Sequence, residues 1–491
     1  MSESLKVRTA RAVKWNAADR IASQALYAVT GIVLARLLSP EDFGLAGAVL
    51  VFQAFASLLI DSGFSYALLQ SKRPSRLDYS TVLWFNLACA LIIYMILFAS
   101  APLVALCFGG DERLIPISRV MFLSFILNAS AIVQVNRLTK MMNVRPLAMA
   151  NVIALVGGGV TGIWLAVAGY GAWAIVWQSI AVAGLKSLAL WLSSRWLPLL
   201  KFSVESLRKF FAVGSGMMLT SLLNTIFAYI NSFIIGNRIG MVPLGYYTQA
   251  DKWSKMGVMS IQQTLTSSFI PPLSDAQDDR PRFLRLCSKM NRMAAYVTMP
   301  CLIGLMVMAT PIFHLLFGTK WDTSIALFVL LLARGIFTIL SALYNNYLLA
   351  LGRTRKIVRL EMVRDVLSIV ALAVTISYLG LSTTTDIVCG VRILLYGQLA
   401  AAFLSWMVTL MVTCRETGAS PRRFVLDLAP YAALSLAVAV LLWIITMWNV
   451  HPALILALQV VAGGSIYLAA NALLGSRVQY DAWQYIRGKM K

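Results

Sequence analysis

Two stretches of sequence, IVLARLLSPEDFGLA (Ile32–Ala46) and FIIGNRIGMVPLGYY (Phe233–Tyr247), show how this chain is organised. In each, an apolar segment stops at a short polar turn and a second apolar segment follows. The two align at an offset of 201 positions, which pairs Gly44 with Gly245. An internal repeat over this distance predicts a chain built from two similar halves.

The composition places both halves in a membrane. Of the 491 residues, 59% are hydrophobic and 13% are charged, which is too apolar for a water-soluble protein of this length. Apolar runs of about 20 or more residues recur, each long enough to cross roughly 30 Å of hydrocarbon as a helix. We therefore predict an all-α polytopic membrane protein with about fourteen transmembrane helices. The expected spans are residues 15–37, 43–69, 79–108, 114–136, 147–169, 172–194, 209–236, 243–272, 290–317, 323–349, 358–379, 386–413, 424–447 and 452–474.

A second alignment sets the domain organisation. The stretch CFGGDE, from Cys107, matches LFGTKW, from Leu316, at an offset of 209, which also pairs Asn143 with Gly352. Two units of six spans share one orientation, so a pseudo-two-fold along the membrane normal is expected to relate them. Such lobes are typical of transporters, which rock one lobe against the other. The predicted parts are a cytoplasmic segment (1–14), an N-lobe (15–195), a cytoplasmic linker (196–208), a C-lobe (209–414), helices 13 and 14 (415–474) and an amphipathic tail (475–491).

The distribution of basic residues predicts the orientation. With the N-terminus in the cytoplasm, 30 of the 42 Lys and Arg residues fall in inner segments, and only Arg113, Arg238 and Lys320 fall in outer loops. Positive charge collects on the cytoplasmic side of bilayers, so both termini are expected there. The net charge of +22 is then a signal of topology and of attraction to anionic membrane lipids, and nucleic acid is not an expected partner.

Charged residues deep within the spans are the candidate binding site, because charge in hydrocarbon is unfavourable without water or a partner. Helix 1 carries Asn16, Arg20 and Gln24 at intervals of four, and such spacing puts them on one face. Lys252, Lys255 and Gln262 lie along one face of helix 8 with Met259 and Thr266. The candidate substrate-binding residues are Arg20, Gln24, Asp61, Lys186, Lys252, Lys255, Gln262 and Arg334.

The balance of these charges favours an anionic substrate. Arg334 lies 11 residues into helix 10, roughly 16 Å deep. Lysine and arginine outnumber acids in the expected cleft, and such clusters hold phosphate, so we expect a phosphate-bearing lipid. Asp61 either neutralises Lys186 or Arg20 in a structural pair or takes part in function. The glycines at 157–159 are expected to let helices pack closely.

Sequence features that would indicate an enzyme or a metal site are missing. The six cysteines have no CxxC spacing, and we find no nucleophile constellation, metal cluster or phosphate-cradling glycine loop. The outer loops SPED, GGDER and AGYGA are too short to hold a catalytic domain. We therefore expect neither catalytic residues nor a cofactor.

Four motifs in order carry a family resemblance: LARLLSPEDFG (Leu34–Gly44), IDSGFSYALLQ (Ile60–Gln70), FIPPLS (Phe269–Ser274) and LLALGRTRK (Leu348–Lys356). In these the chain resembles Wzx-type polysaccharide flippases of the colanic acid and teichuronic acid exporter branch, within the MOP superfamily. The resemblance covers nearly the whole chain.

This resemblance implies a flippase that moves an undecaprenyl-pyrophosphate-linked oligosaccharide from the inner to the outer leaflet of the bacterial cytoplasmic membrane. It implies a cationic cavity lined by helices 1, 2, 7 and 8, which Arg20, Lys252 and Lys255 match in helix and type. It also implies coupling to protons, sodium or the membrane potential, and work beside a polysaccharide polymerase and export machinery.

Two classes of alternative stay open. Within the superfamily, the alternatives to a polysaccharide flippase are a cation-coupled drug antiporter and a flippase for the peptidoglycan lipid precursor. An antiporter for cationic drugs would favour acidic residues in the cavity. From the enzyme class, a membrane glycan polymerase or ligase is the alternative, and such enzymes usually carry a large outer loop.

Overall fold

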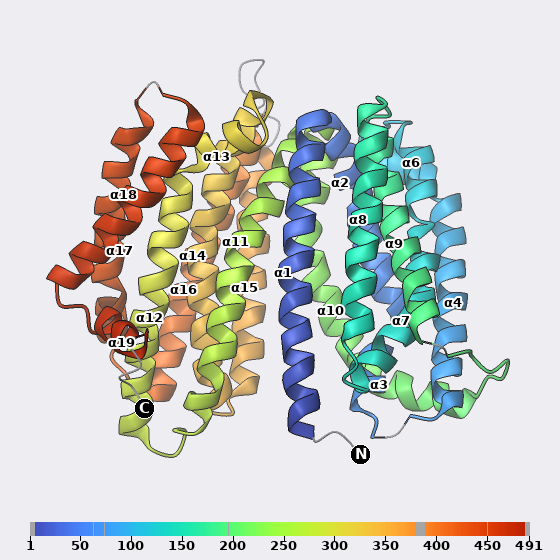
Figure 1. Cartoon of the computed structure of the whole chain (residues 1–491), viewed down its shortest axis with the longest axis horizontal. Helices are drawn as coiled ribbons and strands as arrows, with labels where there is room; N and C mark the ends of the chain where they lie inside the picture. The colour runs from blue at the N-terminus through green and yellow to red at the C-terminus, as the bar shows by residue number, and fades with distance from the viewer. Residues whose placement is uncertain are drawn as a thin grey trace. The chain divides into compact units, whose positions relative to one another are not determined.

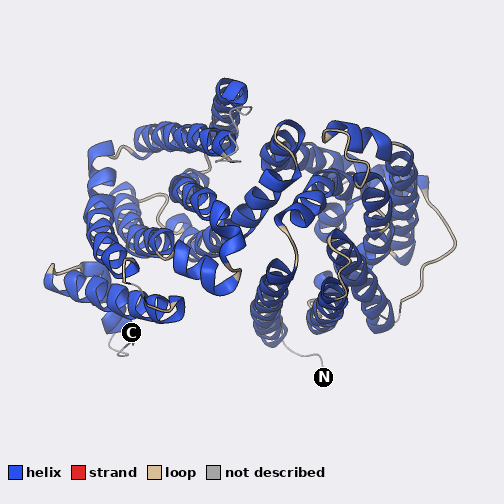
Figure 2. Cartoon of the chain, turned by 90° about the horizontal axis from the view of Figure 1, so that it is seen from above, coloured by secondary structure: helices blue, strands red, loops and turns tan. Residues whose placement is uncertain are grey.

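The computed structural model describes residues 5–61, 63–72, 74–194, 196–378, 388–448 and 450–486, and every regular element within these ranges is a helix (Figures 1 and 2). The first four residues of the predicted N-terminal segment and the last five of the predicted tail lie outside them. By its contacts the chain divides into two units, Met1–Gly245 and Tyr246–Lys491.

The first unit holds ten helices and the start of an eleventh in its described part. They are α1 (Leu5–Leu37), α2 (Pro40–Asp61), α3 (Phe64–Gln70), α4 (Arg76–Ala99), α5 (Ala101–Cys107), α6 (Leu114–Met121), α7 (Ser124–Lys140), α8 (Arg145–Val167), α9 (Ala172–Ser194), α10 (Val204–Arg238) and the first turn of α11 (Met241–Ser274). Three predicted spans are each split in two, as α2 and α3, α4 and α5, and α6 and α7. The first break has a backbone cause, because Gly63 has a left-handed φ of 72°.

The second unit contains the rest of α11 and the following elements. They are α12 (Arg280–Val307), α13 (Ala309–Leu316), the 3₁₀ turn η1 (Thr319–Trp321), α14 (Asp322–Ala350), α15 (Thr354–Thr375), the 3₁₀ turn η2 (Ile376–Tyr378), α16 (Cys389–Thr417), α17 (Pro421–Thr446), α18 (Pro452–Leu473) and α19 (Arg477–Ile486). The helices α17 and α18 run side by side as an antiparallel pair (Figure 1).

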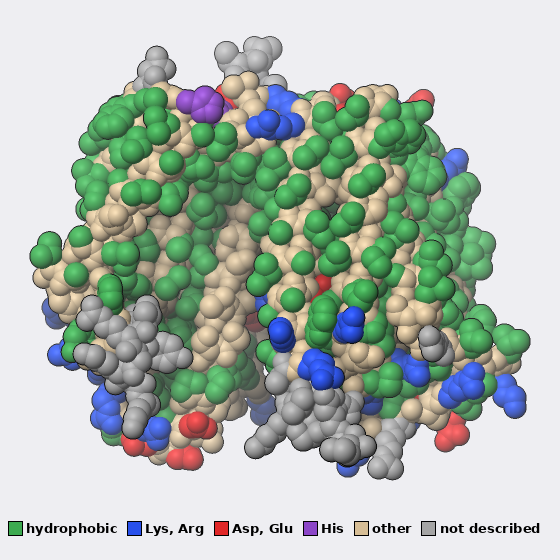
Figure 3. All heavy atoms as spheres, in the orientation of Figure 1, with side chains coloured by type: hydrophobic (Ala, Val, Ile, Leu, Met, Phe, Trp, Pro, Cys, Tyr) green, Lys and Arg blue, Asp and Glu red, His purple; other side chains and the backbone are tan. Residues whose placement is uncertain are grey.

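The prediction of an all-α membrane protein is confirmed. Within the described ranges, eleven helical stretches are long and apolar enough to cross a membrane. The helices α1, α11 and α15 are as long but too polar to count among the eleven, so the structure is compatible with fourteen spans. On the face drawn in Figure 3, hydrophobic side chains are spread over most of the surface, and the Lys and Arg side chains in view gather near its upper edge and in its lower part. Such a surface suits lipid.

The helix boundaries repeat at the offsets found in the sequence. The end of α10 follows the end of α1 by 201 residues, and the start of α11 follows the start of α2 by the same number. At the later offset of 209 residues, the end of α13 follows the end of α5, and the start of α15 follows the start of α8. The repeat is therefore present in the secondary structure. The symmetry axis and the predicted lobe limits stay predictions.

Two repeat-related glycines meet within the first unit. A Cβ added to Gly44 would lie 1.9 Å from the carbonyl oxygen of Met241, and one added to Gly245 would lie 1.7 Å from that of Pro40. Pro40 and Met241 are themselves 201 residues apart, so the contact is reciprocal. The first turns of α2 and α11 thus cross backbone against backbone, and only glycine leaves room for that approach.

The glycines at 157–159 pack α8 closely, as predicted. A Cβ on Gly158 would meet Val182 of α9 at 2.3 Å, and one on Gly159 would meet Thr30 of α1 at 2.8 Å. Small residues at these positions let α8 lie directly against both neighbours. The contact matters for the site, because α1, α8 and α9 carry some of its polar residues.

The chain between α9 and α10 is fixed along α4. The Ser80 hydroxyl accepts from the backbone N–H of Leu199 at 2.8 Å, and the Trp84 indole donates to the Leu199 carbonyl at 2.8 Å. The helix α10 then packs on α2, α3 and α4, so the first helix of the predicted C-lobe belongs to the first unit by its contacts.

Candidate functional site

The predicted site residues are divided between the two units. Arg20, Gln24, Asp61 and Lys186 lie in the first unit, and Lys252, Lys255, Gln262 and Arg334 lie in the second. On α1, the side chains of Asn16, Arg20 and Gln24 are all exposed, as a polar stripe on one helix face requires. Their role in binding stays a prediction.

A polar cluster outside the predicted site residues forms around Asp19. The Asn151 amide of α8 donates to both carboxylate oxygens, at 3.0 and 3.2 Å, and the Ser23 hydroxyl donates at 3.2 Å. The charge of Asp19 also acts on the Lys186 ammonium of α9. Helices α1, α8 and α9 therefore contribute to one half-buried polar cluster, and the i, i+4 spacing of Asp19 and Ser23 was its only trace in the sequence.

Asp61 does not pair with Lys186 or Arg20, although such a structural pair was one of the two predictions for this residue. Asp61 accepts a hydrogen bond from the Ser65 hydroxyl at 2.6 Å, and Asn136 donates to that hydroxyl at 2.8 Å. Asp61 thus spans the break between α2 and α3, where a carboxylate satisfies the N–H groups of a new helix. Helix α9, which carries Lys186, packs on α8, and α8 packs on α1.

In the second unit, α11 carries the densest set of predicted residues. The Lys255 ammonium pairs with the Asp251 carboxylate one turn earlier, at 2.6 Å. The Lys252 ammonium lies 5.5 Å from the centroid of the Trp253 ring, in range of a cation–π interaction. Gln262 is half-buried further along the helix.

The neighbour of this part of α11 is α14. The Thr266 hydroxyl accepts from the Asn346 amide at 3.3 Å, and Val258 packs against Gly335, where a Cβ would meet it at 2.3 Å. Arg334 is half-buried and adjoins Gly335 in the sequence, so it lies beside the contact of the two helices. Arg334 therefore lies on α14, which contacts the lysine-bearing α11 at Gly335 and Asn346.

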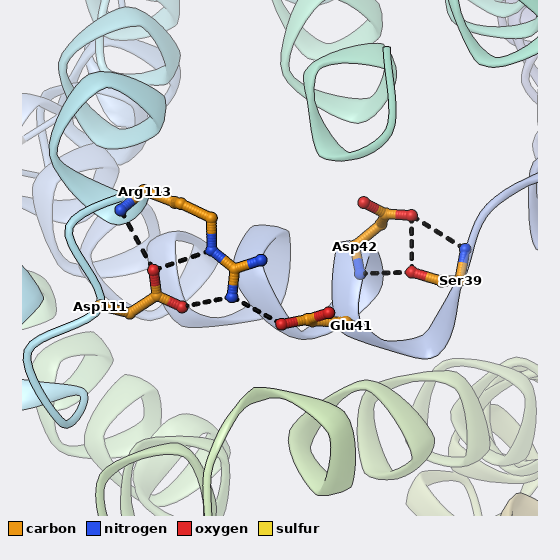
Figure 4. A network of polar contacts seen from close by, with 5 residues as sticks. All are labelled: Ser39, Glu41, Asp42, Asp111 and Arg113. Atoms are coloured by element: carbon orange, nitrogen blue, oxygen red, sulfur yellow. Dashed lines mark hydrogen bonds and ion pairs between the residues drawn. The ribbon is translucent and has the colours of Figure 1, made fainter. Parts of the chain in front are cut away.

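A second network holds the start of α2 (Figure 4). Ser39 and Asp42 form a reciprocal cap, in which the Asp42 carboxylate accepts from the Ser39 N–H at 2.9 Å and the Ser39 hydroxyl accepts from the Asp42 N–H at 3.2 Å. Arg113, from the loop after α5, pairs with Glu41 at 2.5 Å and with Asp111 at 2.7 Å.

The charges of this network support one another. The hydrogen bonds from Arg113 hold the pKa of Asp111 below its usual value, and those to Asp111 and Glu41 raise the pKa of the Arg113 guanidinium. The ion pairs tie α2 to the α5–α6 loop. The signal of this network in the sequence is a basic Arg113 two residues after Asp111, together with the acidic Glu41 in another short outer loop.

The described residues bring no three His, Cys, Asp or Glu side chains together as a metal site. The cysteines of this part of the chain are all free thiols. What the arrangement offers chemically is charge and hydrogen-bonding groups on long, partly polar helices.

The fold is similar to that of two solved membrane transporters. The structure is similar to the lipid II flippase MurJ in an inward closed conformation, with a TM-score of 0.74 and 13% identity, covering 93% of this chain and 98% of that one. It is also similar to an inward-facing multidrug resistance MATE family transporter, with a TM-score of 0.60 and 15% identity, covering 80% and 94% of the two chains.

The family described as polysaccharide biosynthesis protein matches residues 33–326, and the chain belongs to this family. The succinoglycan biosynthesis transport protein ExoT of Rhizobium meliloti is 26% identical over 355 residues, 72% of each chain. The lipopolysaccharide biosynthesis protein WzxC of Escherichia coli is 23% identical over 352 residues, 71% of each chain. The teichuronic acid biosynthesis protein TuaB of Bacillus subtilis is 24% identical over 345 residues, 69% of this chain and 71% of that one. The resemblance found in the sequence motifs is confirmed.

Proposed function

We propose that this protein is a flippase that carries undecaprenyl-pyrophosphate-linked oligosaccharide repeat units from the inner to the outer leaflet by alternating access. Membership of the polysaccharide biosynthesis family and a transporter fold support the class of function. The observation that carries the choice of substrate is the cationic face of α11, where Lys252 and Lys255 lie on a long helix too polar to count among the apolar spans.

The chemistry of those side chains favours a pyrophosphate. An ammonium group in a membrane needs water, a carboxylate or an anionic ligand. Lys255 has Asp251 at 2.6 Å, and a pyrophosphate competes for that ammonium with more charge and more acceptor oxygens. Arg334 on the adjoining helix adds a planar donor suited to phosphate.

The location in the cytoplasmic membrane with both termini inside belongs to the same proposal, supported by the excess of Lys and Arg in the predicted inner segments. Coupling to protons, sodium or the membrane potential, and work alongside a polymerase and export machinery, stay predictions. The proposed role is transport without covalent chemistry.

Ligand-dependent thermal stability tests this function. A ligand that binds only the folded protein raises the melting temperature with its free concentration. We expect stabilisation of the purified protein by an undecaprenyl-pyrophosphate-linked glycan, a smaller effect from undecaprenyl phosphate, and a decrease of both with salt. Stabilisation by a cationic dye, with no response to a polyprenyl pyrophosphate, would instead favour a drug antiporter.

A further inference from the structure

A cavity of about 490 Å³ lies where α18 ends and α19 begins. Arg477, Tyr480 and Gln484 line it, and their spacing of three and four places them on one face of α19. Trp483 joins them, and the end of α18 contributes Ala472 and the turn residue Gly475. The cavity is therefore formed by a short helix laid against the end of a long one.

Contacts with three helices fix α19 to the second unit. Val478 is buried with Leu428 and Tyr431 of α17, and the Asp481 carboxylate pairs with the Lys289 ammonium of α12 at 2.7 Å. The Gln479 amide donates to the Leu468 carbonyl of α18 at 3.0 Å. Three helices thus hold α19 in one orientation, so its cavity face is already formed before a ligand arrives.

The polar groups of the cavity define what it holds. Arg477 supplies an exposed cation that suits a phosphate. Gln479 also lines the cavity and is 7% exposed, and its side-chain oxygen has no hydrogen-bond partner in the described part of the chain. A buried acceptor without a donor raises the free energy of the folded protein, because the oxygen has lost its hydrogen bonds to water. A ligand that carries both an anion and a hydroxyl donor satisfies the two groups together.

The surroundings of the cavity are apolar and aromatic. Leu473 and Leu474, between the lining residues of α18 and the turn, are largely exposed, as are Tyr480 and Trp483 on α19. Aromatic rings beside exposed aliphatic side chains and a basic residue are typical of the membrane–water boundary. Acyl chains are the ligand part that such a surface accommodates.

We propose that this cavity is a binding site for a glycerophospholipid with an anionic phosphodiester and a hydroxyl-bearing head group, of the phosphatidylglycerol class. Arg477 binds the phosphate, Gln479 accepts from a head-group hydroxyl, and the acyl chains lie along the end of α18. The site is independent of the proposed flippase function, because it shares no residue with α11 or with the other predicted substrate-binding positions.

The test is native mass spectrometry of the purified full-length protein with added lipid. We expect phosphatidylglycerol to bind more tightly than phosphatidylmethanol, which has the same charge but no hydroxyl, and both to bind more tightly than zwitterionic phosphatidylcholine. Arg477→Gln should weaken phosphatidylglycerol binding about ten-fold, because a charge-assisted contact is lost. Arg422→Gln, at an exposed arginine outside the cavity, should have no effect.

The lipid series on the unaltered protein keeps the test decisive if a variant folds poorly. Equal binding of phosphatidylglycerol and phosphatidylcholine, or wild-type binding by folded Arg477→Gln protein, overturns the site. Equal binding of phosphatidylglycerol and phosphatidylmethanol overturns the role of Gln479 and the head-group assignment. Glycan export is not the readout, so failure here leaves the proposed function standing.

Discussion

At the scale of single residues, the two lysines of α11 have different surroundings. Lys255 has a carboxylate partner one turn away, and Lys252 lies against the ring of its neighbour Trp253. An ammonium group carries three N–H donors and a phosphate carries several acceptor oxygens, so each of these side chains is chemically suited to a phosphate ligand.

We predict that Lys252→Ala and Lys255→Ala each lower glycan export about ten-fold, because each removes a charge-assisted contact to the substrate. Protein level in the membrane should stay near normal, since the loss is of charge and not of packing. Arginine at either position should retain more activity than alanine, because the charge persists while the geometry changes. Export is measured in cells that lack the native gene.

Lys201→Ala is the matched control, because this exposed lysine lies between α9 and α10, away from α11. It should export normally. Normal export by both α11 alanine variants would mean that this helix face does not meet the substrate.

At the scale of elements, the crossing of α2 and α11 depends on two glycines that the sequence repeat had already paired. Each lets the carbonyl of the other helix come within 2 Å of where a Cβ would lie, and no side-chain movement relieves a clash with backbone. The networks of Ser39 with Asp42, and of Arg113 with Glu41, fix the same end of α2 (Figure 4).

We predict that Gly44→Ala and Gly245→Ala destabilise the protein by about 1–3 kcal/mol or more, as overpacking does in well-packed interiors. The result should be a lower melting temperature in detergent and less protein in the membrane. Gly464→Ala in α18 is the control, because a Cβ there meets nothing within 4 Å and alanine favours helix. An unchanged melting temperature for both crossing variants would contradict the close approach.

At the scale of the whole molecule, membrane topology is the property on which the proposed transport depends. Cysteine substitution with chemical labelling measures topology. Ser39 and Ser75 each cap a helix through their hydroxyls, so replacing them with cysteine would remove a cap. Glu112, in the α5–α6 loop, and Ser420, before α17, are exposed.

We predict that, in a variant without its six native cysteines, Glu112→Cys reacts with an impermeant maleimide from the periplasm. Ser420→Cys should react only after the reagent reaches the cytoplasm, because basic residues collect in the inner segments. Labelling of intact cells at Ser420→Cys but not at Glu112→Cys would reverse the orientation and every leaflet assignment with it.

The sequence by itself determined the all-helical membrane fold, the places of the eleven apolar helical stretches, and the repeat that pairs Gly44 with Gly245. Those features are local, since hydrophobicity and turn residues act over one helix length. The tertiary structure alone decided which polar side chains meet: Asn151 of α8 donates to Asp19 of α1, and Arg113 reaches Glu41. The physical reason is that a charged side chain in a helix has neighbours on every adjoining helix, and only packing selects among them.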